Sequence, residues 1–303
     1  MTTFKVFVFV VLATAVVSTL TAETHCPGNA ASLPLRLVNR HLMIVPVFIN
    51  RSGPYDFLLD TGAQMTTLDP TLAVELRLDK QREALVEGIG SRQSASLAHL
   101  DVLEAGSHAV ANQRVIVSDL KNLQSTGLRI RGILGEDFLE HFDMLIDYAH
   151  RLLCLDDTAA MRSSVKGPHV ALVAGPEAAE GAALPKLLIV EARLSEATRP
   201  VRLMLDSGAN IPFLYHPSEY LAMGSKRDTS LQGAGMNGAQ QFLQALPPQT
   251  VKIGSVKIPD LSFRTIAGPR TNARATDVDG LLTMGLFRRV FIDHTDQFVV
   301  LEP

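Results

Sequence analysis

The chain of 303 residues contains the same sequence pattern twice, and this internal repeat constrains its fold more than any other feature. Residues 57–63 (FLLDTGA) return as residues 203–209 (LMLDSGA), 146 positions later. The Ile-Asp pair at 146–147 returns at 292–293 with the same separation. Matches that keep one register over about a hundred residues indicate a duplicated domain, because a repeated unit fixes the architecture of a chain.

Each repeat has the same plan of short β-type segments separated by turn signals. In the first repeat we expect a strand at residues 42–49 and a turn at residues 53–54, and in the second a strand at 186–194 and a turn at 198–200. In both repeats a second strand follows the turn and ends on the repeated aspartate. Further strands are expected at residues 114–117, 145–147, 151–155, 250–253, 291–293 and 298–301, and the glycine-flanked apolar stretches 132–135 and 280–282 precede short helices. Many short strands and little helix predict an all-β fold.

These patterns divide the chain into two lobes. The first lobe is expected at residues 31–155, a linker at residues 156–167 and the second lobe at residues 168–303. The Gly-, Pro- and Ala-rich stretch at 174–185 is interpreted as a long loop inside the second lobe.

The first 22 residues have the features of a secretory signal peptide. Lys5 supplies a positive charge, residues 6–20 form an apolar run that is short for a membrane span, and Ala22 provides a small residue for cleavage. We therefore expect a periplasmic or secreted protein with no stable membrane association after cleavage. An uncleaved N-terminal membrane anchor is the alternative.

Cys26 and Cys154 are the only cysteines. An exported protein could pair them, but Cys154 lies in the apolar run at residues 151–155, where a buried free thiol is equally natural. We expect no disulfide.

Composition and motif spacing exclude several classes of function. The net charge is −3, tryptophan is absent and aromatic residues make up 6%, so no nucleic-acid partner is expected. The nine histidines show no metal-binding spacing, and we expect no metal and no cofactor. Residues 233–238 (GAGMNG) match the dinucleotide-binding fingerprint, but they follow a polar segment instead of a strand, so we discount the match.

Asp60 and Asp206 are the predicted catalytic residues, one from each repeat. Two carboxyl groups held close together cannot both ionise, so they share one proton, and one can act as a base on water while the other donates to a carbonyl oxygen. The hydroxyl residue after each aspartate can join the two loops, and the next glycine lets backbone N–H groups approach the carboxylates. These loop residues are Thr61, Gly62 and Ala63 in the first repeat and Ser207, Gly208 and Ala209 in the second.

The two Asp-Thr/Ser-Gly-Ala loops, each behind an apolar strand, and the GILG stretch at 132–135 resemble the retropepsin-like branch of the aspartic peptidases. The resemblance covers nearly the whole chain after residue 22. It implies two retropepsin-like β-barrel lobes related by pseudo-two-fold symmetry, an aspartic endopeptidase with a peptide or protein substrate, and Asp60 and Asp206 as its dyad. Covalent duplication predicts a monomer. By the same resemblance the candidate flap residues are Gly88, Ile89 and Gly90, and Gly233, Ala234 and Gly235.

One position departs from the family pattern. Thr283 stands where the second repeat would have a glycine, and it is expected to change the close packing beneath Asp206. This departure leaves open a second function, a catalytically impaired bilobal peptide-binding module. The separation of the Asp60 and Asp206 carboxyl groups distinguishes the two functions, because only a dyad in hydrogen-bonding contact can share a proton.

Two further repeated features carry expectations. Asp147 and Asp293 each precede a hairpin turn and are interpreted as structural. Alanine stands at positions 63 and 209, where pepsin-like enzymes commonly have a hydroxyl residue that can donate to a carboxylate. A missing donor raises a carboxyl pKa, so the dyad is expected to titrate above the pepsin values of about 1.5 and 4.7.

Overall fold

The computed structural model describes most of the chain after the predicted signal peptide. The described residues are 25–27, 30–38, 41–79, 81–88, 91–120, 123, 129–156, 160–175, 185–221, 231–234, 240–266 and 278–303. The predicted signal peptide and the candidate flap residues Ile89, Gly90 and Gly235 lie outside the described residues. In the part of the chain that is described, no helix is both long and apolar enough to span a membrane.

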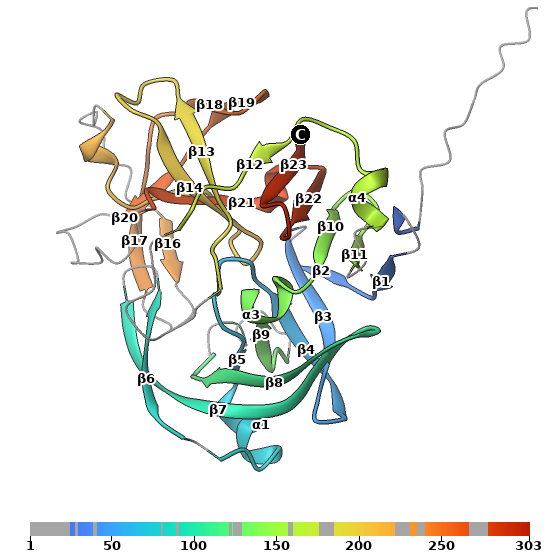
Figure 1. Ribbon diagram of the computed structural model, residues 1–303. Helices are drawn as coiled ribbons and strands as arrows, with labels where there is room; N and C mark the ends of the chain where they lie inside the picture. Colours follow the sequence, from blue (N-terminus) through green and yellow to red (C-terminus); the bar gives the residue numbers. More distant parts are fainter. Residues whose placement is uncertain are drawn as a thin grey trace, which may run out of the picture.

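The first repeat forms an eight-stranded sheet in the order β2-β3-β4-β9-β5-β8-β7-β6 (Figure 1). Its strands are β2 (Arg36–Val38), β3 (Leu42–Ile49), β4 (Ser52–Leu59), β5 (Thr67–Leu68), β6 (Glu83–Gly88), β7 (Ser91–Ala105), β8 (His108–Val117) and β9 (Gly132–Leu134). Two helices of this repeat lie wholly within the described residues, and both are short: α1 (Pro70–Glu75) and α3 (Glu136–Leu139).

The second repeat forms a nine-stranded sheet in the order β16-β17-β20-β15-β21-β14-β13-β18-β19. Its strands are β13 (Ile189–Leu194), β14 (Val201–Asp206), β15 (Phe213–Leu214), β16 (Leu231–Ala234), β17 (Gln240–Ala245), β18 (Gln249–Ile253), β19 (Val256–Leu261), β20 (Arg264–Ile266) and β21 (Gly280–Thr283). Two single-turn 3₁₀ helices, η2 (Pro217–Glu219) and η3 (Met284–Leu286), belong to this repeat.

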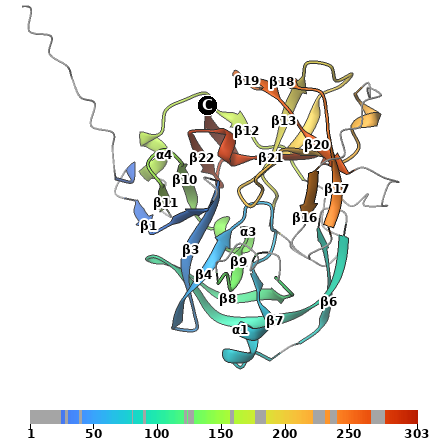
Figure 2. The same ribbon diagram turned by 180° about the vertical axis from the view of Figure 1, so that it is seen from behind.

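A six-stranded sheet joins the two lobes, in the order β1-β11-β10-β22-β23-β12 (Figure 2). Its strands are β1 (Ala31–Leu33), β10 (Asp143–Asp147), β11 (Leu152–Asp156), β12 (Val170–Ala171), β22 (Arg289–Asp293) and β23 (Phe298–Glu302). β10 of the first lobe pairs antiparallel with β22 of the second, with Met144 opposite Ile292. Each lobe therefore contributes one hairpin, and the two hairpins are hydrogen-bonded along a shared edge.

The two repeats place the aspartate strand in the same surroundings. β4 runs parallel to β9, with Leu59 opposite Leu134, and β14 runs parallel to β21, with Leu205 opposite Leu282. β5 and β15 pair antiparallel with the other edges of β9 and β21. The predicted all-β fold with two related lobes is therefore confirmed.

Alternation along these strands separates two apolar layers, as the two-residue period of a strand requires. Leu59 and Leu205 belong to the main core that runs through both lobes, whereas their neighbours Leu58 and Met204 face smaller clusters on the opposite side of each sheet. Gly132 allows close packing, because a Cβ atom there would overlap the Phe57 ring.

One predicted turn is displaced. Residues 53 and 54 lie inside β4, and the chain turns instead at Asn50 and Arg51, between the paired residues Ile49 and Ser52. Both turn residues have positive φ, 50° and 67°. A two-residue hairpin needs this conformation, and asparagine adopts it readily, so the Asn signal outweighs the Gly-Pro signal.

The prediction of two free cysteines is wrong, because Cys26 and Cys154 form a disulfide. β1 pairs antiparallel with β11, with Ser32 opposite Cys154, and this pairing brings the N-terminal segment alongside the sheet. The two Cα atoms are 5.7 Å apart although 128 residues separate the cysteines in sequence. The apolar surroundings of Cys154 predicted its burial correctly, but burial does not distinguish a thiol from a disulfide.

The predicted linker contains a helix. α4 (Ala160–Ser164) follows β11 and buries Met161 against the six-stranded sheet. Its Arg162 contacts carboxylates from both lobes, Asp143 and Asp293. The segment between the repeats is therefore packed onto the interlobe sheet in its described part.

Candidate active site

The Asp60 and Asp206 loops meet through a reciprocal set of four hydrogen bonds. The Thr61 hydroxyl donates to the Leu205 carbonyl (2.9 Å) and accepts from the Ser207 backbone N–H (3.1 Å). The Ser207 hydroxyl donates to the Leu59 carbonyl (3.0 Å) and accepts from the Thr61 N–H (3.1 Å). Both hydroxyl residues are buried, so water does not compete for these bonds. The two loops meet as predicted, and each holds the other in place.

Each carboxyl group is fixed by its own loop and lies against the opposite one. Gly62 N–H donates to Asp60 Oδ1 and Gly208 N–H to Asp206 Oδ1, both at 2.8 Å. A Cβ atom on Gly62 would lie 2.7 Å from the Asp206 carboxyl carbon, and one on Gly208 would overlap the Asp60 carboxyl group. Glycine is therefore required at both positions for the two carboxyl groups to approach.

Asp60 and Asp206 form one buried, hydrogen-bonded pair of carboxyl groups. Each residue is only 8% exposed. Burial raises the pKa of Asp60, and burial together with the neighbouring charge of Asp60 raises the pKa of Asp206 well above its usual range. Full ionisation would place two negative charges side by side in a buried site, so the pair favours a state with one shared proton.

Thr283 changes the contacts beneath Asp206 but keeps the loop in place. In the first lobe the backbone N–H of Glu136 donates to the Ala63 carbonyl at 2.8 Å. In the second lobe the Thr283 hydroxyl donates to the matching carbonyl, that of Ala209, at 2.7 Å. The side chain therefore supplies the donor that the backbone supplies in the first lobe. The predicted change of packing is present, and the Ala209 carbonyl keeps a hydrogen-bond donor through the Thr283 side chain.

The candidate flap residues belong to two β-hairpins. Gly88 ends β6 and is paired with Ser91 of β7, while Gly233 and Ala234 lie in β16, which pairs with β17. The ends of the two hairpins lie near each other in both views (Figures 1 and 2). The antiparallel pairing of β16 also differs from the strand-to-helix turn of a dinucleotide-binding loop.

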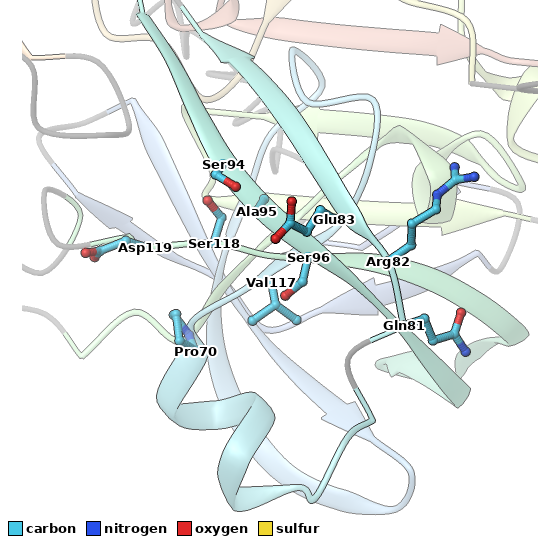
Figure 3. A pocket seen from close by; sticks show the side chains of 10 residues that line it. All are labelled: Pro70, Gln81, Arg82, Glu83, Ser94, Ala95, Ser96, Val117, Ser118 and Asp119. Atoms are coloured by element: carbon cyan, nitrogen blue, oxygen red, sulfur yellow. The ribbon is translucent and has the colours of Figure 1, made fainter.

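A pocket of about 540 Å³ lies in the first lobe, where α1, the start of β6, the first part of β7 and the end of β8 come together (Figure 3). None of its lining residues belongs to the two aspartate loops. They are Pro70, Gln81, Arg82, Glu83, Ser94, Ala95, Ser96, Val117, Ser118 and Asp119. The lining mixes polar and charged side chains with the apolar residues Pro70, Ala95 and Val117. The chemistry of the site therefore resides in the paired loops and not in this pocket.

The residues interpreted as structural have that role. Asp147 Oδ1 accepts from the His150 backbone N–H at 2.9 Å, and Asp293 Oδ1 accepts from the Asp296 N–H at 2.7 Å. Each carboxylate closes the turn that follows its strand, as predicted. Among the described residues, no group of three or more His, Cys, Asp or Glu side chains is arranged to hold a metal ion.

Sequence reasoning missed four titratable residues close to the site. Burial and the charge of Asp206 raise the pKa values of Tyr148 and Tyr215, which keeps both phenols protonated. Glu136 and His294 form a buried pair beneath the Asp60 loop. None of these four residues repeats between the lobes, so the comparison of the two repeats could not reveal them.

Asp137 provides a prediction about stability. It accepts from the Thr66 N–H (2.8 Å) and hydroxyl (2.7 Å), and burial raises its pKa to about 6. The folded state holds this proton more tightly than the unfolded state. The resulting stabilisation is complete below pH 3.8 and is lost as the pH rises through 6. Asp137→Asn should therefore reduce the fall in unfolding free energy between pH 4 and 7 by about 2 kcal/mol. Urea unfolding at both pH values measures this, and identical pH dependence in both proteins would contradict it.

The fold and the paired loops define a two-lobed aspartic-protease architecture. Residues 45–138 match the family model described as aspartyl protease. A retropepsin-like aspartic protease from Rickettsia conorii is 21% identical over 42% of this chain and 90% of its own, with a TM-score of 0.32. The aspartic proteinase from Irpex lacteus is 13% identical over 90% of this chain and 97% of its own, with a TM-score of 0.48. No curated protein matches the chain in sequence.

The family match contains the first aspartate loop and β9, the strand that supports it. It confirms the predicted resemblance to the aspartic proteases over the first repeat. Together with the fold, it supports a peptidase-like function.

Proposed function

We propose that the protein is an aspartic endopeptidase that hydrolyses peptide bonds with a water molecule activated between Asp60 and Asp206. The observation that carries the proposal is the hydrogen-bonded pair of buried carboxyl groups, held by reciprocal bonds between two equivalent loops. A dyad arranged in this way can share one proton, which is the property that the reaction requires.

In the working state one carboxyl group is ionised and the other is protonated. The carboxylate accepts a proton from water as the water oxygen attacks the peptide carbonyl carbon, and the protonated group donates its proton to the carbonyl oxygen. Proton transfer to the amide nitrogen then allows the tetrahedral intermediate to collapse, which breaks the C–N bond and returns one proton to the dyad. The fixed loops supply the orientation that such a reaction needs.

A peptide-library digest with the purified protein tests the proposal. Cleavage that disappears in Asp60→Asn supports an endopeptidase. Peptide binding without cleavage would instead identify the alternative, a catalytically impaired bilobal peptide-binding module. Because the Thr283 hydroxyl preserves the Asp206 loop, the geometry favours turnover.

We also propose that the protein acts outside the cytoplasm, in the periplasm or as a secreted protein. The sequence features of residues 1–22 support this location. The disulfide between Cys26 and Cys154 supports it independently, because disulfides persist in oxidising compartments. Since one chain supplies both aspartates, we propose that the protein works as a monomer on a peptide or protein substrate.

The pH dependence of hydrolysis follows from the alanines at positions 63 and 209. No side-chain hydroxyl at these positions can donate to the dyad, and burial raises the pKa of both carboxyl groups. Activity requires the singly protonated pair, so the active pH range should lie at mildly acidic pH instead of strongly acidic pH. In Ala63→Ser/Ala209→Ser the acidic limb of the pH–rate profile should move to lower pH. An acidic limb that stays in place would mean that hydroxyl donation does not set the range.

A further inference from the structure

A buried ion pair connects the two lobes directly beneath the Asp60 loop. Glu136 Oε2 lies 3.2 Å from His294 Nε2, and the two side chains are 0% and 5% exposed. Glu136 is the first residue of α3 in the first lobe, and His294 follows β22 in the second. The proposed reaction does not use this pair, although both groups are titratable and are buried from solvent.

The surroundings of His294 determine where its protons lie. Its Nδ1 is 2.6 Å from the Phe142 carbonyl oxygen, which can only accept, so Nδ1 carries a proton. Nε2 then faces the Glu136 carboxyl group, and one more proton must lie between them for a hydrogen bond to form. If that proton is lost, two acceptors face each other across a buried contact. The interlobe bond therefore exists only while this proton is bound.

Glu136 is also part of the support of the catalytic loop. Its backbone N–H donates to the Ala63 carbonyl at 2.8 Å, and the preceding Gly135 N–H donates to the Thr66 hydroxyl at 3.1 Å. Burial raises the pKa of Glu136 against the lowering effect of His294, and the charges of Glu140 and then Asp60 raise it further. A change in the charge of Glu136 must act back on Asp60 with the same coupling energy, because such coupling is reciprocal.

The second lobe has no equivalent pair. Met284 begins η3 at the position that Glu136 holds in the first lobe, and Tyr148 follows β10 as His294 follows β22. Met284 is fully buried. The charged pair therefore lies on one side of the pseudo-symmetric dyad only, and it makes the surroundings of Asp60 and Asp206 chemically different.

We propose that Glu136 and His294 are positioning residues whose shared proton holds the Asp60 loop against the second lobe and tunes the protonation of the dyad. The role in catalysis rests on the proposed peptidase function, whereas the coupling between the two pairs does not.

The other charged groups around the pair are few. Glu140 and Asp60 face Glu136, and Asp143, which accepts from the His294 backbone N–H, faces the imidazole. Arg162 lies against Asp143 and is also paired with Asp293. His294 is the hydrogen-bond partner that the structure gives the Glu136 carboxyl group.

The direction of the pH effect follows from the pKa shifts of both partners. Burial lowers the pKa of His294, but the hydrogen bond and the charge of Glu136 outweigh burial, and the pKa is raised above 6.5. Burial raises the pKa of Glu136 as well. The stabilisation from the pair is therefore complete below pH 6.5 for the imidazole and is lost as the pH rises through its raised value.

The test uses Glu136→Gln, because its amide can donate to neutral His294 and keeps the contact without the charge. NMR titration of the full chain follows the His294 imidazole and the carboxyl carbons of Asp60 and Asp206. In the variant, the pKa of His294 should fall by about one unit, and the upper apparent pKa of the dyad by about half a unit. The matched control is Asp147→Asn, which removes the carboxylate that pairs with His150 inside one hairpin. It should change neither the pKa of His294 nor that of the dyad.

Unchanged titration of either His294 or the dyad in Glu136→Gln would overturn the inference. If that variant does not fold, Glu136→Met/His294→Tyr introduces the residues of the second lobe at the matching positions, and the dyad pKa should fall in the same direction. These titrations need no substrate. A protein that cleaves no peptide would therefore contradict the proposed function and leave the coupling intact, whereas an active enzyme with an unmoved dyad pKa would contradict the coupling alone.

Discussion

Replacing either Asp60 or Asp206 with asparagine should abolish peptide hydrolysis and leave the protein folded. One carboxyl group must accept a proton while the other donates one, and an amide can perform neither step. The amide oxygen can still accept the bond from the next glycine, so the loops should keep their shape. We expect a loss of rate of at least about 10³-fold in each variant. Initial rates on a fluorogenic peptide and circular dichroism measure the two effects.

Asp147→Asn is the matched control, since it changes a buried aspartate of the first lobe outside the aspartate loops. It should retain activity at temperatures where it is folded. More than a small residual rate in Asp60→Asn or Asp206→Asn would end the assignment of the dyad.

An added methyl group on either loop glycine should be the next most damaging change. The Cβ atom of Gly62→Ala would lie 2.7 Å from the Asp206 carboxyl carbon, and that of Gly208→Ala would overlap the Asp60 carboxyl group. The carboxyl groups must then move apart. A displacement of about 1 Å at a reacting group costs about 10²-fold in rate, and we expect kcat to fall by that factor or more.

Gly175→Ala is the control for the loop glycines, because its methyl group would make an ordinary contact at 3.5 Å with Ile189 Cδ1. It should leave kcat unchanged. Wild-type kcat in Gly208→Ala would show that the methyl group is accommodated without moving the Asp60 carboxyl group, and the argument from close approach would then fail.

The sequence predicted the parts of the fold that depend on local pattern. The apolar run at residues 42–49 coincides with β3, and the repeated Asp-Thr/Ser-Gly triplets end strands that lie side by side with glycine-flanked strands. The constant spacing between the two repeats was sufficient to predict that Asp60 and Asp206 meet. Equivalent units related by a two-fold axis can place equivalent residues next to that axis.

Other features depend on information that a single segment does not contain. The Cys26–Cys154 bond requires the pairing of β1 with β11, which joins segments more than a hundred residues apart. The Glu136–His294 pair requires the packing of one lobe on the other, and it breaks the repeat. Helix α1 was missed although its signal is local: Asp69 caps it by accepting from the Thr71 N–H, and a proline follows the cap.

The pairing of β10 with β22 has a consequence for how the protein folds and for what happens when the chain is cut. β10 is hydrogen-bonded to β11 on one side and to β22 on the other, and Met144, Leu145 and Ile146 are all buried. Either half alone would expose an unpaired strand edge and a strip of apolar side chains, a combination that invites aggregation. The duplicated halves are therefore one cooperative folding unit, and a protease cut in the segment that joins them should give two fragments that remain associated and separate only on denaturation.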